Sequence, residues 1–421
     1  MRDKRRWIEW GKDLLIVLLT LSAGWLLTMT PLVQDSGVMG TLSSQGGSGA
    51  GLPVESRGAA ILPVRLAFAG TGGRFGVQYN EALLEELFPP LGALLGDALA
   101  SAGQPRPISE GEWRKYLGGI SAYFDFQGEA PLAALERWLG GPGETGLAGC
   151  ARRVMLCAGE GDQVLLCWQE AGSGQFFSCP TALTRGLHLE PAVESQAPNG
   201  AYFAFESQKL TRLLDPYTLI TEGEQGGAGY TVSVPLSAGG AETAAVLEAL
   251  SFNGQNHAQV SGGEVYLDGG DRLVVDRGGT VTYRAAQSGK YPVGEGAANG
   301  ADGARALAER TLGALCGEAR LYLMSAQGED GALRVRFGYL LDGCAVRLDG
   351  EGWAAELWVR DGYIVQFTLR FRSYAVNGTR ALLLPIDKAA AMLPDLTQER
   401  RELVLQYWDN GGSLSPEWVA A

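Results

Sequence analysis

Apolar and polar residues alternate most regularly between residues 335 and 371 of the chain. In three successive runs every second position is apolar, a period that is typical of β-strands with one buried face. The apolar positions are Val335, Phe337, Tyr339 and Leu341; Trp353, Ala355, Leu357 and Val359; and Tyr363, Val365, Phe367, Leu369 and Phe371. The positions between them carry most of the Arg, Glu, Gln and Thr. The pattern predicts an antiparallel sheet with one side in a core and the other facing water or a partner.

Three Asp-Gly pairs punctuate these runs, at Asp342–Gly343, Asp349–Gly350 and Asp361–Gly362. Tight hairpin turns require positive φ angles, which Gly and Asp adopt more readily than most residues. The pairs therefore predict the structural turns of a ribbon. Their carboxylates are available for chemistry, but turn formation explains all three.

Helical patterns accompany the strands in both halves of the chain. Residues 80–103 have helical spacing that is interrupted at Pro89-Pro90, and Ser109 followed by Glu112 predicts a capped helix start. Residues 241–252 and 300–315 are the matching helices of the second half. The sequence therefore predicts an α+β fold in which antiparallel sheets pack against helices.

The N-terminus has a different pattern. Residues 1–13 are basic, and residues 14–33 form a run of 20 residues without a charge. A helix of that length covers about 30 Å, the thickness of the bilayer hydrocarbon. We therefore expect a single transmembrane helix, with the basic flank in the cytoplasm and the bulk of the chain outside the cell membrane. The alternatives are a cleaved signal peptide, whose apolar core is shorter, and a buried core helix.

Small residues recur at every fourth position of this segment, at Thr20, Gly24 and Thr28. Positions four apart share one face of a helix, and small side chains let another helix approach closely. The pattern predicts a partner-binding face in the membrane, although such triplets also arise by chance.

Composition divides the remainder of the chain. The Gly/Ser-rich residues 34–60 are typical of a flexible tether. We expect an N-terminal α+β region at 61–238 and a C-terminal one at 239–421, the latter either one unit or two submodules at about 239–299 and 300–421. The net charge of −13 excludes a sequence-independent nucleic-acid binder, which needs a basic surface, and is otherwise explained by solubility.

Six cysteines lack the spacing of a zinc site. Residues 152–169 read as a hairpin in which Cys157 faces Val164, so that Cys167 lies about 10 Å away, too far for a disulfide. The cysteines are then small core residues, and a pairing of Cys150 with Cys179 stays open.

No motif of catalysis or cofactor binding is complete. The glycines that begin at Gly70 miss the dinucleotide-binding spacing, and Gly289-Lys290 lacks the rest of a phosphate loop. His188 and His257 lie in different halves with no nucleophile nearby. No carboxylate pair stands out, although the sequence does not exclude one. We expect no enzyme, cofactor or metal.

Three passages together resemble the YycH/YycI-type proteins, the membrane-anchored accessory proteins of the WalK sensor kinase in Gram-positive bacteria. They are "WRKYLGGISAYFDFQGEAPLAALERWLG", "FNGQNHAQVSGGEVYLDGGDRLVVDRGGTVTYRA" and "VRFGYLLDGCAVRLDGEGWAAELWVRDGYIVQFTLRFRSY". The aromatic-glycine strands around "DGCAV" and "RDGYI" are their most specific part. The length is closer to YycH than to YycI, and the tether and cysteines indicate a divergent, clostridial-type relative.

The resemblance implies a non-enzymatic regulator of a two-component sensor kinase. Its partners would be a WalK-like kinase and a sister anchored protein of the YycH/YycI type, contacted in part through the membrane helix. Two alternatives remain: a tethered cell-wall enzyme or wall-polymer-binding module, and a secreted protein whose signal is cleaved.

Overall fold

The computed structural model describes residues 61–143, 145–221, 227–236, 240–350, 352–392 and 401–420. Within these ranges no helix is both long enough and apolar enough to cross a bilayer. The predicted membrane segment 14–33, with Thr20, Gly24 and Thr28, and the tether 34–60 lie outside the described residues.

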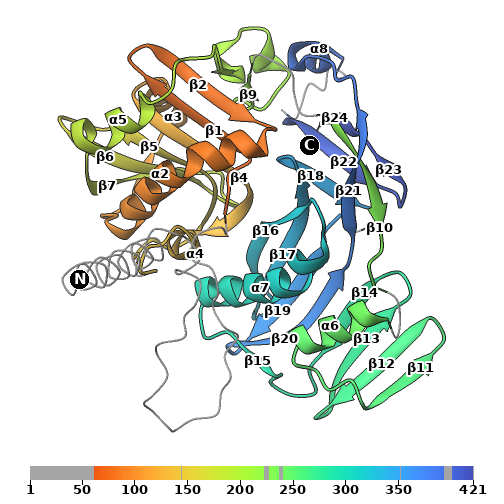
Figure 1. Cartoon of the computed structure of the whole chain (residues 1–421). Helices are drawn as coiled ribbons and strands as arrows, with labels where there is room; N and C mark the ends of the chain where they lie inside the picture. Colours follow the sequence, from red (N-terminus) through yellow and green to blue (C-terminus); the bar gives the residue numbers. More distant parts are fainter. Residues whose placement is uncertain are drawn as a thin grey trace, which may run out of the picture. The chain divides into compact units, whose positions relative to one another are not determined.

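The first part of the described chain forms an antiparallel sheet in the strand order β3-β7-β6-β5-β4-β1-β2 (Figure 1). Its strands are β1 (Arg65–Gly70), β2 (Gly73–Gln78), β3 (Arg106–Ile108), β4 (Ser121–Pro131), β5 (Cys150–Ala158), β6 (Gln163–Glu170) and β7 (Phe176–Thr184). The helices are α2 (Glu81–Ala100), α3 (Glu110–Leu117) and α4 (Leu132–Trp138).

Both faces of this sheet are buried, which explains its nearly continuous apolar strands. Leu66 and Phe68 of β1 share a core with apolar residues of α2, whereas Ala67 between them shares a second core with Trp113 of α3. Helix α3 begins with the predicted capping box, because the Ser109 hydroxyl accepts from the Glu112 N–H and the Glu112 carboxylate accepts in return.

Helix α2 runs through Pro89 and Pro90, so the predicted interruption at these residues is wrong. A proline in a helix removes one hydrogen bond and crowds the preceding turn. Both prolines lie on the exposed side, while Leu84, Leu87 and Leu91 on the other side are buried. Burial of that apolar face holds the helix together across the prolines.

The second part forms a larger sheet in which β11-β12-β13-β14-β20-β19-β17-β16 are successive antiparallel neighbours. The strands are β11 (His257–Val260), β12 (Gly263–Asp268), β13 (Asp271–Asp276), β14 (Thr280–Arg284), β15 (Tyr291–Pro292), β16 (Arg320–Glu329), β17 (Ala332–Leu341), β18 (Cys344–Leu348), β19 (Ala355–Arg360), β20 (Tyr363–Arg370), β22 (Leu403–Asp409) and β24 (Pro416–Ala420). Strand β17 also pairs with β18, which continues through parallel β22 to β24.

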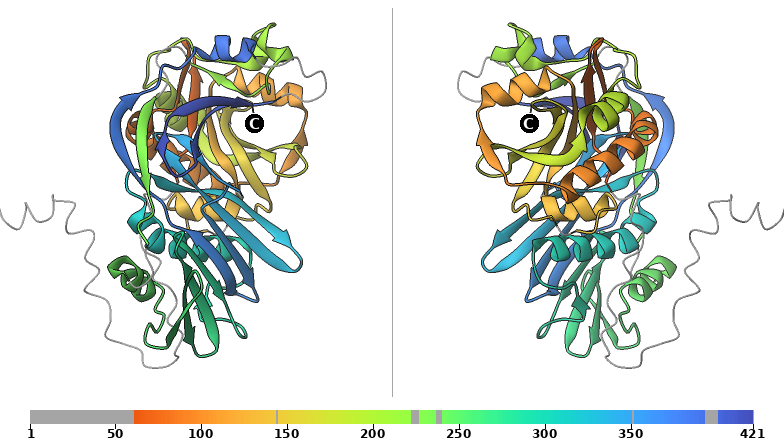
Figure 2. Two further views of the ribbon diagram at one scale, coloured as in Figure 1. Left: turned by 90° about the vertical axis from the view of Figure 1, so that its right-hand side faces the viewer. Right: turned by 90° about the vertical axis from the view of Figure 1, so that its left-hand side faces the viewer.

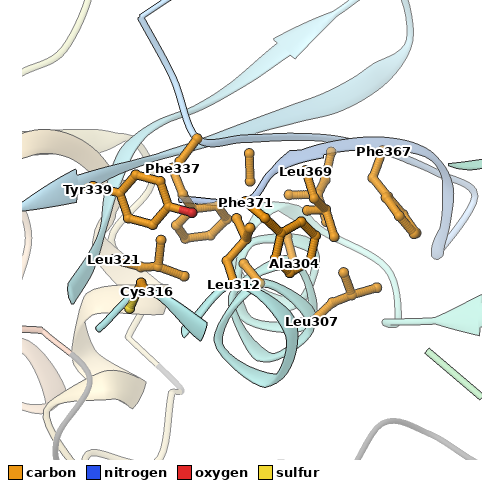
Figure 3. Close-up of a cluster of buried hydrophobic side chains, with 14 of the residues drawn as sticks. Ala304, Leu307, Leu312, Cys316, Leu321, Phe337, Tyr339, Phe367, Leu369 and Phe371 are labelled. Atoms are coloured by element: carbon orange, nitrogen blue, oxygen red, sulfur yellow. The ribbon is translucent and has the colours of Figure 1, made fainter. Parts of the chain in front are cut away.

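Helices α6 (Ala241–Ala249) and α7 (Ala297–Thr311) cover one face of this sheet. Helix α7 places Ala304 and Leu307 against Phe367 and Leu369 of β20 (Figure 3). Apolar residues recur at three- and four-residue intervals along α7, the spacing of a single buried helix face.

The apolar face predicted for β17 is confirmed, since its four positions from Val335 to Leu341 are all buried. The predicted polar face holds at Arg334 and Arg336, which are partly exposed, but not at Leu340, which is buried against Val64. The prediction for β20 is wrong at its start. A bulge opposite Trp358 and Val359 adds one residue to β20, so Ile364 is buried while Tyr363 and Val365 are partly exposed.

Smaller elements complete the described chain. Strands β10 (Ala228–Ser233), β21 (Ser373–Arg380) and β23 (Ser413–Leu414) form a three-stranded sheet, and β8 (Tyr202–Phe203) pairs with β9 (Leu219–Ile220). The short helices are α5 (Glu190–Val193) and α8 (Ile386–Ala391), a π-helical turn at Arg185–Leu189, and 3₁₀ turns at Ala204–Glu206, Leu210–Arg212 and Gly313–Leu315. The fold is α+β and dominated by antiparallel sheet, as the sequence predicts.

The cysteine hairpin is a third point at which the prediction fails. Its register places Cys157 opposite Leu165 rather than Val164, so Cys157 and Cys167 are diagonal neighbours on one face. Their sulfur atoms lie 3.6 Å apart, not about 10 Å. All six cysteines are free thiols, including Cys150 and Cys179, and five of the six are buried.

Candidate functional site

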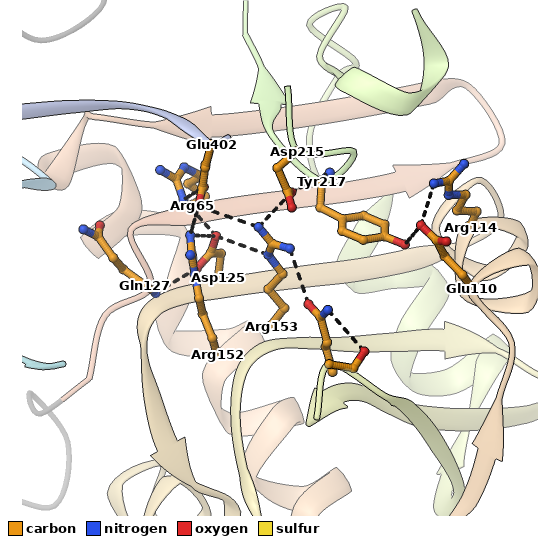
Figure 4. Close-up of polar contacts among 12 residues, drawn as sticks. Arg65, Glu110, Arg114, Asp125, Gln127, Arg152, Arg153, Asp215, Tyr217 and Glu402 are labelled. Atoms are coloured by element: carbon orange, nitrogen blue, oxygen red, sulfur yellow. Dashed lines mark hydrogen bonds and ion pairs between the residues drawn. The ribbon is translucent and has the colours of Figure 1, made fainter. Parts of the chain in front are cut away.

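Charged side chains are buried where the N-terminal sheet meets the segment that leads into β22 (Figure 4). Arg65 lies on β1, Asp125 on β4 and Arg152 on β5, and Glu402 directly precedes β22. We call these four residues the buried charge cluster. It joins residues that are more than 330 positions apart in the sequence.

Each acid of the cluster binds two arginines. Asp125 accepts from Arg65 Nη1 and Arg152 Nε, both at 2.8 Å. Glu402 lies 2.8 Å from Arg65 Nη1 and 2.7 Å from Arg152 Nη2. The Arg65 and Asp125 side chains are 2% and 1% exposed, so solvent screens the ion pair between them very little, whereas Arg152 is 27% exposed.

Further polar contacts extend from the cluster toward helix α3. Arg153, next to Arg152 on β5, donates from Nη2 to Asp215 at 2.9 Å. Asp215 also accepts from the backbone N–H of Tyr217, and the Tyr217 hydroxyl donates to Glu110 at 3.0 Å. Arg153 Nη2 also lies 3.7 Å from Glu402, so the cluster is one end of a polar network that reaches the first residue of α3.

The arginines set the electrostatics of the two acids. Burial by itself raises the pKa of Asp125, but the guanidinium groups of Arg152 and Arg65 outweigh it and hold that pKa well below its usual range. The pKa of Glu402 is likewise lowered, because Arg152, Arg65 and Arg153 outweigh the effect of burial. A general acid or base needs a pKa near the working pH, so these two carboxylates are suited to holding the structure and not to proton transfer.

These pKa shifts predict an acid-sensitive fold. The unfolded chain titrates Asp and Glu near about 3.9 and 4.3. Because both pKa values are lower in the folded protein, the stabilisation is present above those values and is lost as the pH falls through the folded ones. We expect the urea midpoint of unfolding to stay level from pH 7 to about 5 and to fall steeply below about 4. Glu402→Gln should make that fall shallower, and an unchanged slope in this variant would contradict the assignment.

The structure separates the three Asp-Gly turns. Asp342 and Gly343 connect β17 to β18 with φ angles of 51° and 75°. Asp342 accepts from the backbone N–H of Glu81 at 3.2 Å, and the Gly343 N–H donates to the Glu81 carboxylate at 3.1 Å. This turn therefore also holds the first residue of α2 against the second sheet.

The other two turns contact different neighbours. Asp349 follows β18 and accepts from the indole N–H of Trp408 at 2.9 Å, and Gly350 after it has a φ of 83°. Asp361 and Gly362 connect β19 to β20 with φ angles of 49° and 75°, and the Gly362 carbonyl accepts from the Val293 N–H. The structure does not bring the three aspartates together, so they form no joint site.

The buried charge cluster was not among the sites predicted from the sequence. A signal for it exists, because Arg65 interrupts the apolar run "ILPVRLAFA" and Asp125 interrupts "AYFDFQ". A charge inside an apolar strand needs a partner when both faces of the sheet are covered. The further partners are Arg152 and Glu402, and no local pattern in the sequence connects these two residues to Arg65 or Asp125.

Other chemistry is sparse in the described part of the chain. Its residues contain no group of three or more His, Cys, Asp or Glu side chains arranged to hold a metal ion. A groove of about 400 Å³ beside α2 is lined mainly by apolar residues, among them Ile61, Phe88 and Trp138, with Glu85 and Arg320 as its charged members. This groove offers no paired acid and base.

A solved structure of similar fold is the crystal structure of YycH from Bacillus subtilis. The two chains superimpose with a TM-score of 0.55, and the match covers 85% of this chain and 95% of that one at 11% sequence identity. No family model matches the sequence, and no curated protein matches it significantly. The likeness shows that the two chains share a fold over most of their length.

Proposed function

We propose that this protein is an extracytoplasmic regulator of a two-component sensor histidine kinase and acts through protein–protein contacts. The observation that carries the proposal is the YycH-like fold, which extends over 85% of the chain. The resemblance of the three sequence passages to YycH/YycI-type proteins supports the same function. The finer assignment is a YycH-like protein of a divergent, clostridial type.

The proposed partners are a WalK-like kinase and a sister anchored protein of the YycH/YycI type. A regulator of this kind shifts a kinase between signalling states only by binding one state more tightly than the other. The role needs surfaces rather than a reaction centre. It fits a chain in which Asp125 and Glu402, the buried acids of the charge cluster, are held in ion pairs by arginines.

The proposed anchor is the segment 14–33, with residues 1–13 in the cytoplasm and the remainder outside a single membrane span. Contact within the membrane would use the face formed by Thr20, Gly24 and Thr28. Outside the membrane, the polar face of the strands that end at the Asp-Gly turns would meet a partner.

The proposal predicts that Gly24→Leu weakens the complex in the membrane. A leucine side chain at Gly24 fills the space through which a second helix approaches. The test is chemical crosslinking of the full-length protein in its own membranes, followed by purification and mass spectrometry. We expect the wild type to recover a sensor kinase or a sister anchored protein, and Gly24→Leu to recover at least about fivefold less.

Ala23→Leu is the matched control, because residue 23 lies about 100° away around the helix. This variant should retain the partner. Recovery of the kinase with equal yield from both variants would retain the regulator and reject the proposed helix face. If neither a kinase nor a sister protein is recovered from wild-type membranes, the regulator proposal fails and a wall-acting protein is favoured.

A further inference from the structure

The helices that pack on the large sheet all lie on one of its two faces. The opposite face has no helix packed on it among the described residues. The core residues of α6 and α7 belong to the same buried cluster as Leu273, Tyr283 and Phe367, so both helices lie on one side. Figure 2 shows these helices on one side of the strands. We call the other side, formed by the alternate residues of β12, β13, β14, β20, β19, β17 and β16, the outward face.

The strand register aligns side chains on the outward face into a row across six strands. From β12 to β17 the row consists of Leu267, Arg272, Arg284, Gln366, Trp358 and Arg334. At about 4.8 Å between strands, the row is about 24 Å long. It runs across the strands, so side chains from distant parts of the sequence are presented together.

The outward face is basic in an otherwise acidic protein. Its strands carry six outward arginines, which are Arg272, Arg284, Arg334, Arg336, Arg360 and Arg370. They carry three outward acids, which are Asp276, Glu329 and Glu356. The whole chain has a net charge of −13, so this excess of positive charge is local.

Three of these arginines, Arg272, Arg284 and Arg360, have no ion-pair or hydrogen-bond partner among the described residues. Glu356 pairs with Arg334 and Arg336 at 2.7 and 2.8 Å, whereas Arg272 and Arg284 are exposed and unpaired. Arg272 and Arg284 are also directly opposite each other on adjacent strands. Like charges at such positions destabilise a sheet, and an anionic partner would offset that repulsion.

Apolar side chains adjoin the arginines. Leu267, in the same row, is 45% exposed, and Val260 on the edge strand β11 is 44% exposed. Arg334 lies over the Trp358 ring, 5.0 Å from its centre. Arginine and aromatic residues are enriched in protein interfaces, and exposed aliphatic groups add nothing to the binding of a fully hydrated polyanion. The composition therefore favours a protein over a charged polymer.

We propose that the outward face binds a carboxylate-rich surface on the extracytoplasmic part of a partner protein. Arg272 and Arg284 would bind the carboxylates, since the planar guanidinium matches the two oxygens of a carboxylate. Leu267 and Trp358 would pack against apolar residues that flank those carboxylates. The identity of the partner rests on the proposed function. What this inference adds is the surface that binds the partner and the chemistry of the contact.

The test places a photo-crosslinking amino acid at Gln366, in the centre of the row, in the full-length protein in its own membranes. We expect a crosslink to another protein, mapped by mass spectrometry to a segment rich in Asp and Glu. The charge-reversed variant R272E/R284E should lower the crosslink at least tenfold. The matched control R212E/R380E reverses two exposed arginines outside the outward face and should leave the crosslink unchanged. Replacing the partner's mapped acids by arginines should restore the crosslink to R272E/R284E.

Several outcomes would overturn the inference. They are a crosslink to a second copy of this chain, a crosslink to a non-protein polymer, equal crosslinking by both double variants, and no rescue by the partner's charge reversal. The test is separable from that of the proposed function. A charge-dependent crosslink to a protein other than a kinase or sister protein keeps the surface and rejects the regulator. Recovery of the kinase through the membrane helix, without a crosslink at Gln366, would keep the regulator and reject the surface.

Discussion

Asp125→Ala is expected to lower the free energy of unfolding by about 3–5 kcal/mol, the cost of removing one member of a buried ion-pair network. Asp125 accepts from Arg65 and Arg152, each at 2.8 Å, and its side chain is 1% exposed. Without it, Glu402 is the one remaining carboxylate of the cluster, and it faces the buried Arg65 and the partly exposed Arg152. Urea unfolding of the full-length protein, followed by tryptophan fluorescence, measures the loss.

The control for this prediction is Asp97→Ala, which makes the same chemical change on the exposed side of α2. Alanine suits a helix interior, so this variant should stay within about 0.5 kcal/mol of the wild type. A loss of less than about 1 kcal/mol in Asp125→Ala would mean that the charge cluster does not hold β22 to the N-terminal sheet.

Gly128→Ala is expected to disrupt the contact between the two sheets and to cost about 3 kcal/mol, the upper part of the range for overpacking. Gly128 lies on β4, where β4 runs beside β16 of the second sheet. A β-carbon at this position would lie 1.6 Å from the carbonyl oxygen of Leu323. Because that oxygen belongs to the backbone, a whole strand must move to make room.

Gly328→Ala on β16 is the matched control for this change. A β-carbon there meets no heavy atom within 4 Å, and its φ angle is not positive. Its free energy of unfolding, obtained from urea denaturation, should stay within about 1 kcal/mol of the wild type, whereas that of Gly128→Ala should fall clearly. Equal midpoints for the two variants would show that β4 and β16 are not in close contact.

The sequence predicted those features that depend on local patterns. The alternation from Val335 to Leu341 predicted the buried face of β17, and the capping pair Ser109 and Glu112 predicted the start of α3. Both depend on residues close together in the chain, where the period of side-chain directions and the local hydrogen bonds decide the structure.

The failures depend on tertiary contacts. A bulge in β20 changes which side chains are buried near Val365, and a shift of one residue in pairing brings Cys157 to Cys167. Packing of the apolar side of α2 overrides the local effect of Pro89 and Pro90. Strand register and packing are set by partners far away in the sequence, which a local pattern does not contain.

The same reason explains what could be predicted of the candidate surfaces. The Asp-Gly turns were evident from adjacent residues, but the contact of Asp342 with Glu81 was not. Of the outward row, a polar face was predicted only for the strands between residues 335 and 371, and not for β12, β13 or β14. Its arginines gather because five successive strand registers align Arg272, Arg284 and Arg334 with their neighbours.

The central claim is that this protein changes the state of a sensor kinase by contact. The most direct test is to reconstitute the full-length protein with the WalK-like kinase of the same organism in lipid vesicles and to measure the rate of kinase autophosphorylation. The account predicts a change of at least about threefold in either direction as the protein is added, and a smaller change with Gly24→Leu. An unchanged rate at a saturating ratio of protein to kinase would contradict it.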